Sequence, residues 1–266
     1  MLKTLRKPRP VADHFWEIDA LRGVAIVMMV TFHFVYDLYV FGISNTVFED
    51  RFWHYFQRTT ASLFIGLVGV SLAVSYTRSV ARHTRLGLTP PSRFSKYLAR
   101  GARILAWALL ISVVTFFALG PTAYVQFGIL HFIGVSVILA YPFLALPGLN
   151  NPLSALTVGA GLLSLGRGLM AQPVETPWLV WLGLMPPGYA AVDYFPLVPW
   201  FGLVLVGIFL GKILFAHNRR RIQLPDLSAF GPVKALQWLG QRSLPIYLIH
   251  QPVLYALFIL ATGSLW

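Results

Sequence analysis

The sequence predicts an all-α, polytopic integral membrane protein, a bundle of about seven transmembrane helices with a cytoplasmic N-terminus. Of its 266 residues, 57% are hydrophobic and only 11% are charged, and the mean hydropathy is +0.68. A soluble domain of this size carries about a quarter charged residues. The apolar residues form long runs with basic clusters between them, a pattern typical of membrane spans joined by cytoplasmic loops.

Seven segments are long and apolar enough to cross the hydrocarbon core, which takes roughly 20 helical residues. In chain order they are Ile18–Gly42, Thr60–Tyr76, Tyr97–Leu119, Val125–Leu146, Leu153–Met170, Phe195–Phe215 and Ser243–Ala261. The apolar segment Trp178–Pro187 is too short to cross and ends in two prolines, so we expect it at the membrane interface or re-entrant. An eighth span there is the alternative. Residues 1–17 are expected to form a cytoplasmic tail, and residues 18–266 a single transmembrane domain.

The distribution of basic residues predicts the orientation. With the N-terminus inside and the spans alternating, 18 of the 21 lysines and arginines lie on the inner side. Only Arg51, Arg58 and Arg167 lie outside. Because cytoplasmic loops carry the excess of positive charge, the N-terminus is expected inside and the C-terminus outside. The same clustering accounts for the net charge of +12 without a nucleic-acid partner. A short amphipathic helix is expected near Lys234, in the last inner loop.

The first predicted span contains four ionisable residues, Asp19, Arg22, His33 and Asp37. Such residues are costly inside a membrane and usually serve a function. Arg22 and His33 are 11 residues apart, so they share one helical face about 16 Å apart, with an acid on the adjacent turn of each. Arginine can bind a phosphate or carboxylate bidentately, and histidine can act as a general base. The alternative is that Arg22 only snorkels and His33 is a structural histidine.

Two further histidines lie within predicted spans. His131 is in the outer half of the fourth span, and His250 is at mid-depth in the seventh, beside Gln251. The chain contains no cysteine, and no two histidines have i, i+4 spacing, so we expect no metal site. Three histidines within the membrane indicate instead a cavity that handles protons or binds a substrate.

Polar and aromatic residues also gather at the outer side. The segment between the first two spans, "FEDRFWHYFQRTTA", contains His54, and Asp193 and Trp200 lie at the outer start of the sixth span. Aromatic faces beside polar groups suit sugar rings as well as membrane interfaces. The glycines of the second and sixth spans predict close helix packing. They are Gly66, Gly69, Gly202, Gly207 and Gly211.

Five segments resemble, in order and position, the bacterial DUF1624 proteins, a family related to the catalytic domain of heparan-alpha-glucosaminide N-acetyltransferase. The segments are "EIDALRGVAIVMMVTFHFVYDL", "SLFIGLVGVSLAVSY", "QFGILHFIGVSVILAY", "YFPLVPWFGLVLVGIFLGK" and "RSLPIYLIHQPVL". Arg22 and His33 also fit the Arg-x10-His motif in the first span of related transmembrane O-acetyltransferases. The resemblance covers the chain from about Glu17 to Tyr255.

The resemblance implies a bacterial inner-membrane enzyme that transfers an acetyl group from cytosolic acetyl-CoA. The acceptor would be an amine or hydroxyl of a saccharide or similar molecule on the outer side. His33 is the candidate general base, with His131 or Asp37 orienting it. The animal enzyme has an asparagine at the position of His33 and its catalytic histidine in the first lumenal loop, where this chain has His54. Either histidine is therefore a candidate base.

The remaining candidate residues divide between donor and acceptor. Those expected to hold the phosphates of CoA are Arg22, Arg78, Arg100 and Arg103. Those expected to bind the acceptor are Asp193, Trp200, His250 and Gln251. The expected partners are acetyl-CoA, a saccharide or other small acceptor and the bilayer, and the sequence is compatible with a homodimer.

Two other classes of protein fit the composition. A transporter or lipid flippase would share the basic inner face and contain a gated cavity, and inverted repeats would favour it. The sequence contains no obvious repeat. A structural or regulatory membrane protein would lack a cavity that links the two faces.

Overall fold

The computed structural model describes residues 15–44, 51–88, 94–169, 174–189, 191–216 and 219–263. Five of its helices are long and apolar enough to cross a membrane. They are α1 (Trp16–Val40), α2 (Arg51–Arg85), α3 (Phe94–Leu119), α7 (Leu197–Leu214) and α9 (Ser243–Thr262). Shorter apolar helices complete the bundle, namely α4 (Ile129–Leu139), its continuation α5 (Tyr141–Ala145) and α6 (Pro152–Leu169). The prediction of an all-α polytopic membrane bundle is confirmed.

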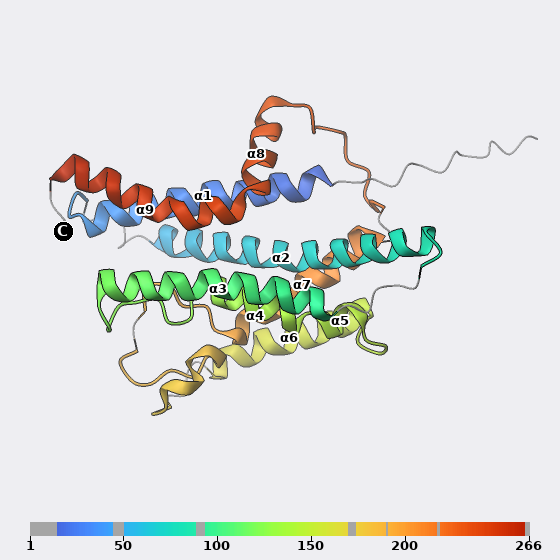
Figure 1. The fold of residues 1–266 in the computed structure, drawn as a ribbon, viewed down its shortest axis with the longest axis horizontal. Coiled ribbons are helices and arrows are strands. Elements are labelled where there is room, and N and C mark those ends of the chain that lie inside the picture. Colours follow the sequence, from blue (N-terminus) through green and yellow to red (C-terminus); the bar gives the residue numbers. More distant parts are fainter. Residues whose placement is uncertain are drawn as a thin grey trace, which may run out of the picture.

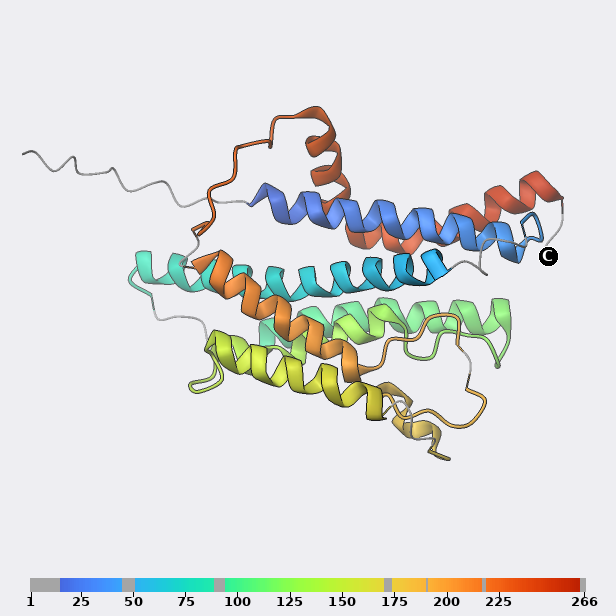
Figure 2. The ribbon, with the colours of Figure 1, turned by 180° about the vertical axis from the view of Figure 1, so that it is seen from behind.

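Consecutive apolar helices run in alternating directions along the bundle (Figure 1). The pair α1 and α9 lies along one side, and α2 separates it from α6 and α7 (Figure 2). The start of α1 and the end of α9 lie at opposite ends of the bundle (Figure 1). Each of the seven predicted spans contains helix, but the fourth is divided into α4 and α5, and only five helices of the described residues have the length and hydropathy of a membrane span. The second differs most, because α2 has 35 residues and extends well beyond Thr60–Tyr76 at both ends.

Two shorter elements also match the sequence predictions. The helix α8 (Gly231–Gln241) lies where an amphipathic helix was expected, and it stands at a steep angle to the bundle (Figure 1). The segment around Trp178 forms a 3₁₀ helix, η1 (Pro177–Leu182), of six residues. At about 2 Å per residue it is far too short to cross a bilayer, so the eighth span does not form.

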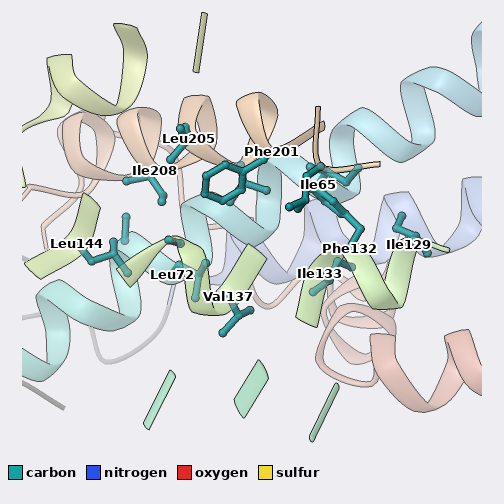
Figure 3. Packing of buried hydrophobic residues seen from close by; sticks show 14 of the residues in the cluster. Ile65, Leu72, Ile129, Phe132, Ile133, Val137, Leu144, Phe201, Leu205 and Ile208 are labelled. Atoms are coloured by element: carbon teal, nitrogen blue, oxygen red, sulfur yellow. The ribbon is translucent and has the colours of Figure 1, made fainter. Parts of the chain in front are cut away.

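The hydrophobic core lies where α2, α4 and α7 meet (Figure 3). Its fully buried side chains include Ile65, Leu72, Phe132, Val137, Leu205 and Ile208. In Figure 3 the side chains of α7 point toward those of α2 and α4. This arrangement fixes α4 and α7 against the long central helix α2.

Glycines allow the closest helix contacts, as the sequence predicted. A Cβ atom at Gly69 would overlap the carbonyl oxygen of Val204, and one at Gly207 would overlap that of Gly66. The small residues therefore let the backbones of α2 and α7 meet directly. The sequence analysis missed a second contact of this kind, in which α8 packs on α1. There a Cβ atom at Gly240 would overlap the carbonyl oxygen of Asp19.

Candidate functional site: a polar track between α1 and α9

Arg22 is held where α1, α2 and α8 meet. Its guanidinium donates hydrogen bonds to the Asp19 carboxylate (3.0 Å), to Ser71 Oγ of α2 (2.7 Å) and to the carbonyl oxygen of Gly240 (3.5 Å). Asp19 also accepts a bond from Gln241 Nε2 (3.1 Å). The predicted pairing of Asp19 with Arg22 is confirmed. Because arginine has five N–H donors, two remain for an anion.

The other predicted arginines lie toward the same end of the bundle. Arg100 and Arg103 are in the first turns of α3. The positive charges of Arg22 and Arg103 lie close enough to the Arg100 guanidinium to repel it. Arg78 lies near the end of α2, with its guanidinium 5.8 Å from the ring centre of Phe15, and its buried Nε has no hydrogen-bond partner among the described residues. This end of the bundle therefore presents a cluster of positive charge.

His33 of α1 meets His250 of α9. The two ring centres are 4.8 Å apart, and the rings are inclined at 70° in an edge-to-face contact. The Nδ1 atom of His33 lies 2.9 Å from the carbonyl oxygen of Met29, and that of His250 lies 2.6 Å from the carbonyl oxygen of Tyr247. A carbonyl only accepts, so we assign the hydrogen to Nδ1 in both rings, which leaves Nε2 of each neutral ring as a base.

Asp37 and Gln251 lie beside the histidine pair. The Asp37 side chain is fully buried, and its Oδ1 accepts a hydrogen bond from Gln251 Nε2 (2.8 Å). Three buried atoms of this group find no donor among the described residues, namely Asp37 Oδ2, Gln251 Oε1 and His250 Nε2. Buried polar atoms without partners are rare in proteins. All three are acceptors, so the group is suited to a ligand that brings N–H or O–H groups.

Asp193 connects the loop before α7 to α4 and α9. Its Oδ2 accepts hydrogen bonds from the backbone N–H of Ile129 (3.1 Å), at the start of α4, and from the Tyr247 hydroxyl (3.4 Å). The Tyr247 carbonyl in turn accepts the bond from His250. Asp193 is thus linked to the histidine pair through Tyr247. The sequence analysis missed Tyr247, although it lies one helical turn before His250 and is therefore on the same face.

His131 makes a different set of contacts. Its Nδ1 accepts a hydrogen bond from the N–H of Gly128 (3.3 Å), which leaves Nε2 to donate to Ser112 Oγ (3.2 Å). One ring nitrogen of His131 therefore caps the start of α4, and the other joins α4 to α3. In the structure the Met29 carbonyl contacts His33 Nδ1. The orienting role of His131 or Asp37 stays a prediction.

Two candidate residues lie apart from this group. Trp200 packs against Phe195 and the hydrophobic core, with ring centres 4.9 Å apart. His54 is not in a loop, as predicted, but exposed in the first turn of α2. The contact between Arg22 and Ser71 sets the register of the antiparallel helices α1 and α2, so His33 is level with Thr60. His54 then lies six residues, or about 9 Å, farther out.

The described part of the chain contains no group of three or more potential metal-ligating side chains. The site consists instead of a basic cluster at one end of α1 and a pair of histidines about 16 Å along it. Beside the pair lie unpaired hydrogen-bond acceptors from α1 and α9.

This fold and these contacts define a polytopic helical membrane protein with a group of polar side chains inside the bundle. The family model described as heparan-alpha-glucosaminide N-acetyltransferase, catalytic, matches residues 14–252, and the chain belongs to this family. Membership places it among transmembrane acetyltransferases, which in general use acetyl-CoA as donor. No curated protein and no solved structure is significantly similar to the chain.

Proposed function

We propose that this protein transfers the acetyl group of cytosolic acetyl-CoA to an amine or hydroxyl in the outer half of the bacterial cytoplasmic membrane. The acceptor is a saccharide or a similar small molecule. The contact between His33 and His250 carries the proposal, because it leaves the Nε2 atoms of two adjacent imidazoles as bases within the bundle.

The donor is bound at the basic end. Arg22, Arg100 and Arg103 face the CoA phosphates, and Arg78 contributes positive charge from α2. Arg22 keeps two N–H donors after its bonds to Asp19, Ser71 and Gly240, so it can still bind a phosphate oxygen. The extended arm of CoA is of the same order of length as the roughly 16 Å from Arg22 to His33 along α1. One helix would thus mark both ends of the donor.

In the transfer step, His33 Nε2 takes the proton from the attacking N–H or O–H of the acceptor. The acceptor atom forms a bond to the acetyl carbonyl carbon, and the carbon–sulfur bond to CoA breaks. The proton then passes from the imidazolium to the departing thiolate. His250 Nε2, Asp37 Oδ2 and Gln251 Oε1 accept the remaining hydrogen bonds of the acceptor, which accounts for their lack of internal partners. Asp193 holds Tyr247, and Trp200 supports the loop before α7.

Replacement of single histidines tests this assignment in protein reconstituted in lipid nanodiscs. His33→Ala is expected to slow acetyl transfer by about 10²–10⁴-fold, the usual cost of losing a positioned base, and to leave acetyl-CoA binding intact. His83→Ala is the matched control, because His83 Nδ1 makes the same type of contact, 2.7 Å from the carbonyl of Ser79, but lies at the end of α2.

The outcomes separate the competing assignments. Loss of activity in His54→Ala with normal activity in His33→Ala would transfer the role of base to the outer end of α2. If the wild type transports a solute and transfers no acetyl group, the proposed acetyltransferase activity is contradicted. The protein would then be a transporter.

A further inference from the structure

An apolar groove lies on the side of the bundle, away from the histidine pair. It has a volume of about 480 Å³ and is bounded by α1, α2 and α7. Its lining includes Leu63, Gly66 and Val70 of α2, and Leu203 and Leu210 of α7. This volume is within the range of roughly 300–1,000 Å³ that is usual for small-molecule sites.

The groove owes its depth to glycine. Gly66 and Gly207 both line it, and they are the residues at which α2 and α7 come into backbone contact. A Cβ atom at Gly66 would have no other atom within 4 Å, so this position opens into free space. The lining on α2 extends from Ser62 to Val70, which corresponds to about 12 Å along the helix.

One end of the groove is closed by a polar cap. Arg220 donates two hydrogen bonds to the Glu17 carboxylate (2.6 and 2.8 Å), and both residues line the groove. The guanidinium of Arg220 also lies 5.6 Å from the ring centre of Phe15, which packs against Phe215. These contacts hold the segment after α7 against the start of α1.

The cap is neutral, and two cations flank it in the sequence. The bidentate bond to Arg220 neutralises Glu17, and the neighbouring Arg219 and Arg221 are exposed. The positive-inside rule assigns this end to the cytoplasm. Basic pockets between transmembrane helices on the cytoplasmic side are typical binding sites for anionic lipid headgroups.

We propose that this groove binds one anionic phospholipid of the cytoplasmic leaflet, with an acyl chain along α2 and the phosphate at Arg219 and Arg221. The lining is apolar and lies among membrane-crossing helices, where lipid chains are the surrounding solvent. The exposed charges of Arg219 and Arg221 beside the cap match an anionic headgroup and not a neutral one. None of the arginines assigned to CoA lines the groove, although Arg78 lies against the same Phe15 ring as Arg220.

Filling the groove tests the position of the acyl chain. Gly66→Leu places a side chain in the open space. Gly161→Leu on α6 is the matched control, since a Cβ atom there also has no atom within 4 Å and Gly161 does not line the groove. Native mass spectrometry of protein reconstituted with phosphatidylglycerol should show one retained lipid in the wild type and in Gly161→Leu. Retention in Gly66→Leu should fall about tenfold or more, because displaced methylenes lose their burial. Equal retention in Gly66→Leu would overturn the proposal.

Charge replacement tests the headgroup. The double variant Arg219→Gln/Arg221→Gln should reduce the preference for phosphatidylglycerol over phosphatidylcholine by up to about thirtyfold. Arg82→Gln/Arg85→Gln, which removes two exposed charges at the end of α2, should preserve that preference. A wild type without headgroup preference would refute the anionic lipid. Lipid loss in Gly66→Leu that occurs only together with loss of a dimer would assign the groove to a second copy of the chain, against the proposal.

Discussion

His33 and His250 meet edge to face, with ring centres 4.8 Å apart, although 217 positions separate them in the chain. Each ring is oriented by a backbone carbonyl of its own helix, so the contact does not depend on a bond between them. Two imidazoles whose Nε2 atoms can accept a proton thus lie side by side between α1 and α9. Either ring can hold a proton there while the other accepts a hydrogen bond.

This relationship predicts a graded effect of histidine replacement. His250→Ala should slow acetyl transfer about tenfold to a hundredfold, less than His33→Ala, because His33 keeps its own bond to Met29. If the two rings act on the same proton, the double variant should lose less than the product of the two single effects. Turnover rates of the four proteins form a double-mutant cycle. Strictly multiplicative losses would show that the two histidines act independently.

Arg22 is expected to contribute to donor binding. Arg22→Ala should weaken acetyl-CoA binding by about 1.5–3 kcal/mol, the range for hydrogen bonds to charged groups, as measured by isothermal titration calorimetry. Arg22→Lys should recover only part of the affinity, since lysine lacks the planar fork. Arg85→Ala, an exposed cation at the end of α2, is the control for general charge.

Arg22 also contacts Asp19, Ser71 and Gly240, so its replacement has a structural component. A thermal unfolding curve for each variant separates the two effects. Affinity for acetyl-CoA unchanged in a folded Arg22→Ala protein would remove this residue from the donor site.

The sequence predicted the fold better than it predicted the site, for a physical reason. The cost of burying backbone and charge in lipid restricts the chain to apolar helices with basic loops, so the positions of the spans follow from hydropathy. The pairing of Asp19 with Arg22 could be predicted because both residues lie on one helix with i, i+3 spacing. Local helical geometry determines that contact.

The contacts between helices could not be predicted in this way. Nothing in the spacing of α1 shows that His250 lies beside His33, or that Gln251 lies beside Asp37, because those pairs depend on how α9 packs. The packing is set in part by Gly23 and Gly240, which bring α8 against α1 and so position the start of α9. His131 and His33 both lie within predicted spans, yet packing gives His131 a bond from Nε2 to Ser112, whereas His33 bonds through Nδ1 to its own helix.

The orientation of the bundle can be tested independently of the chemistry. The chain has no cysteine, so single cysteines can be introduced at residues 219 and 266 without a background. With the N-terminus inside and seven crossings, a membrane-impermeant thiol reagent should label position 266 from outside intact cells, and position 219 only after the membrane is opened. Labelling of both positions from the same side would contradict an odd number of crossings between an inner N-terminus and an outer C-terminus.

Asp37 provides the most specific test of how the acceptor is held. In Asp37→Asn the side chain keeps its shape and can still accept the bond from Gln251, but it loses the charge and replaces one acceptor with an N–H donor. We expect the KM for the acceptor to rise about tenfold to a hundredfold, because a hydrogen bond to a charged group is lost. The affinity for acetyl-CoA should remain that of the wild type, since the basic cluster is about 20 Å away along α1.

Gln251→Ala serves as the companion variant, because it removes the donor that holds Asp37 Oδ1 and one of the unpaired acceptors. It should raise the same KM by a smaller factor, since it removes a neutral acceptor while Asp37 keeps its charge. Initial rates at varied acceptor and fixed, saturating acetyl-CoA measure both effects. A fall in kcat with unchanged KM in Asp37→Asn would show that Asp37 acts on the transfer step itself. The three unpaired acceptors would then belong to the transition state of the reaction and not to acceptor binding.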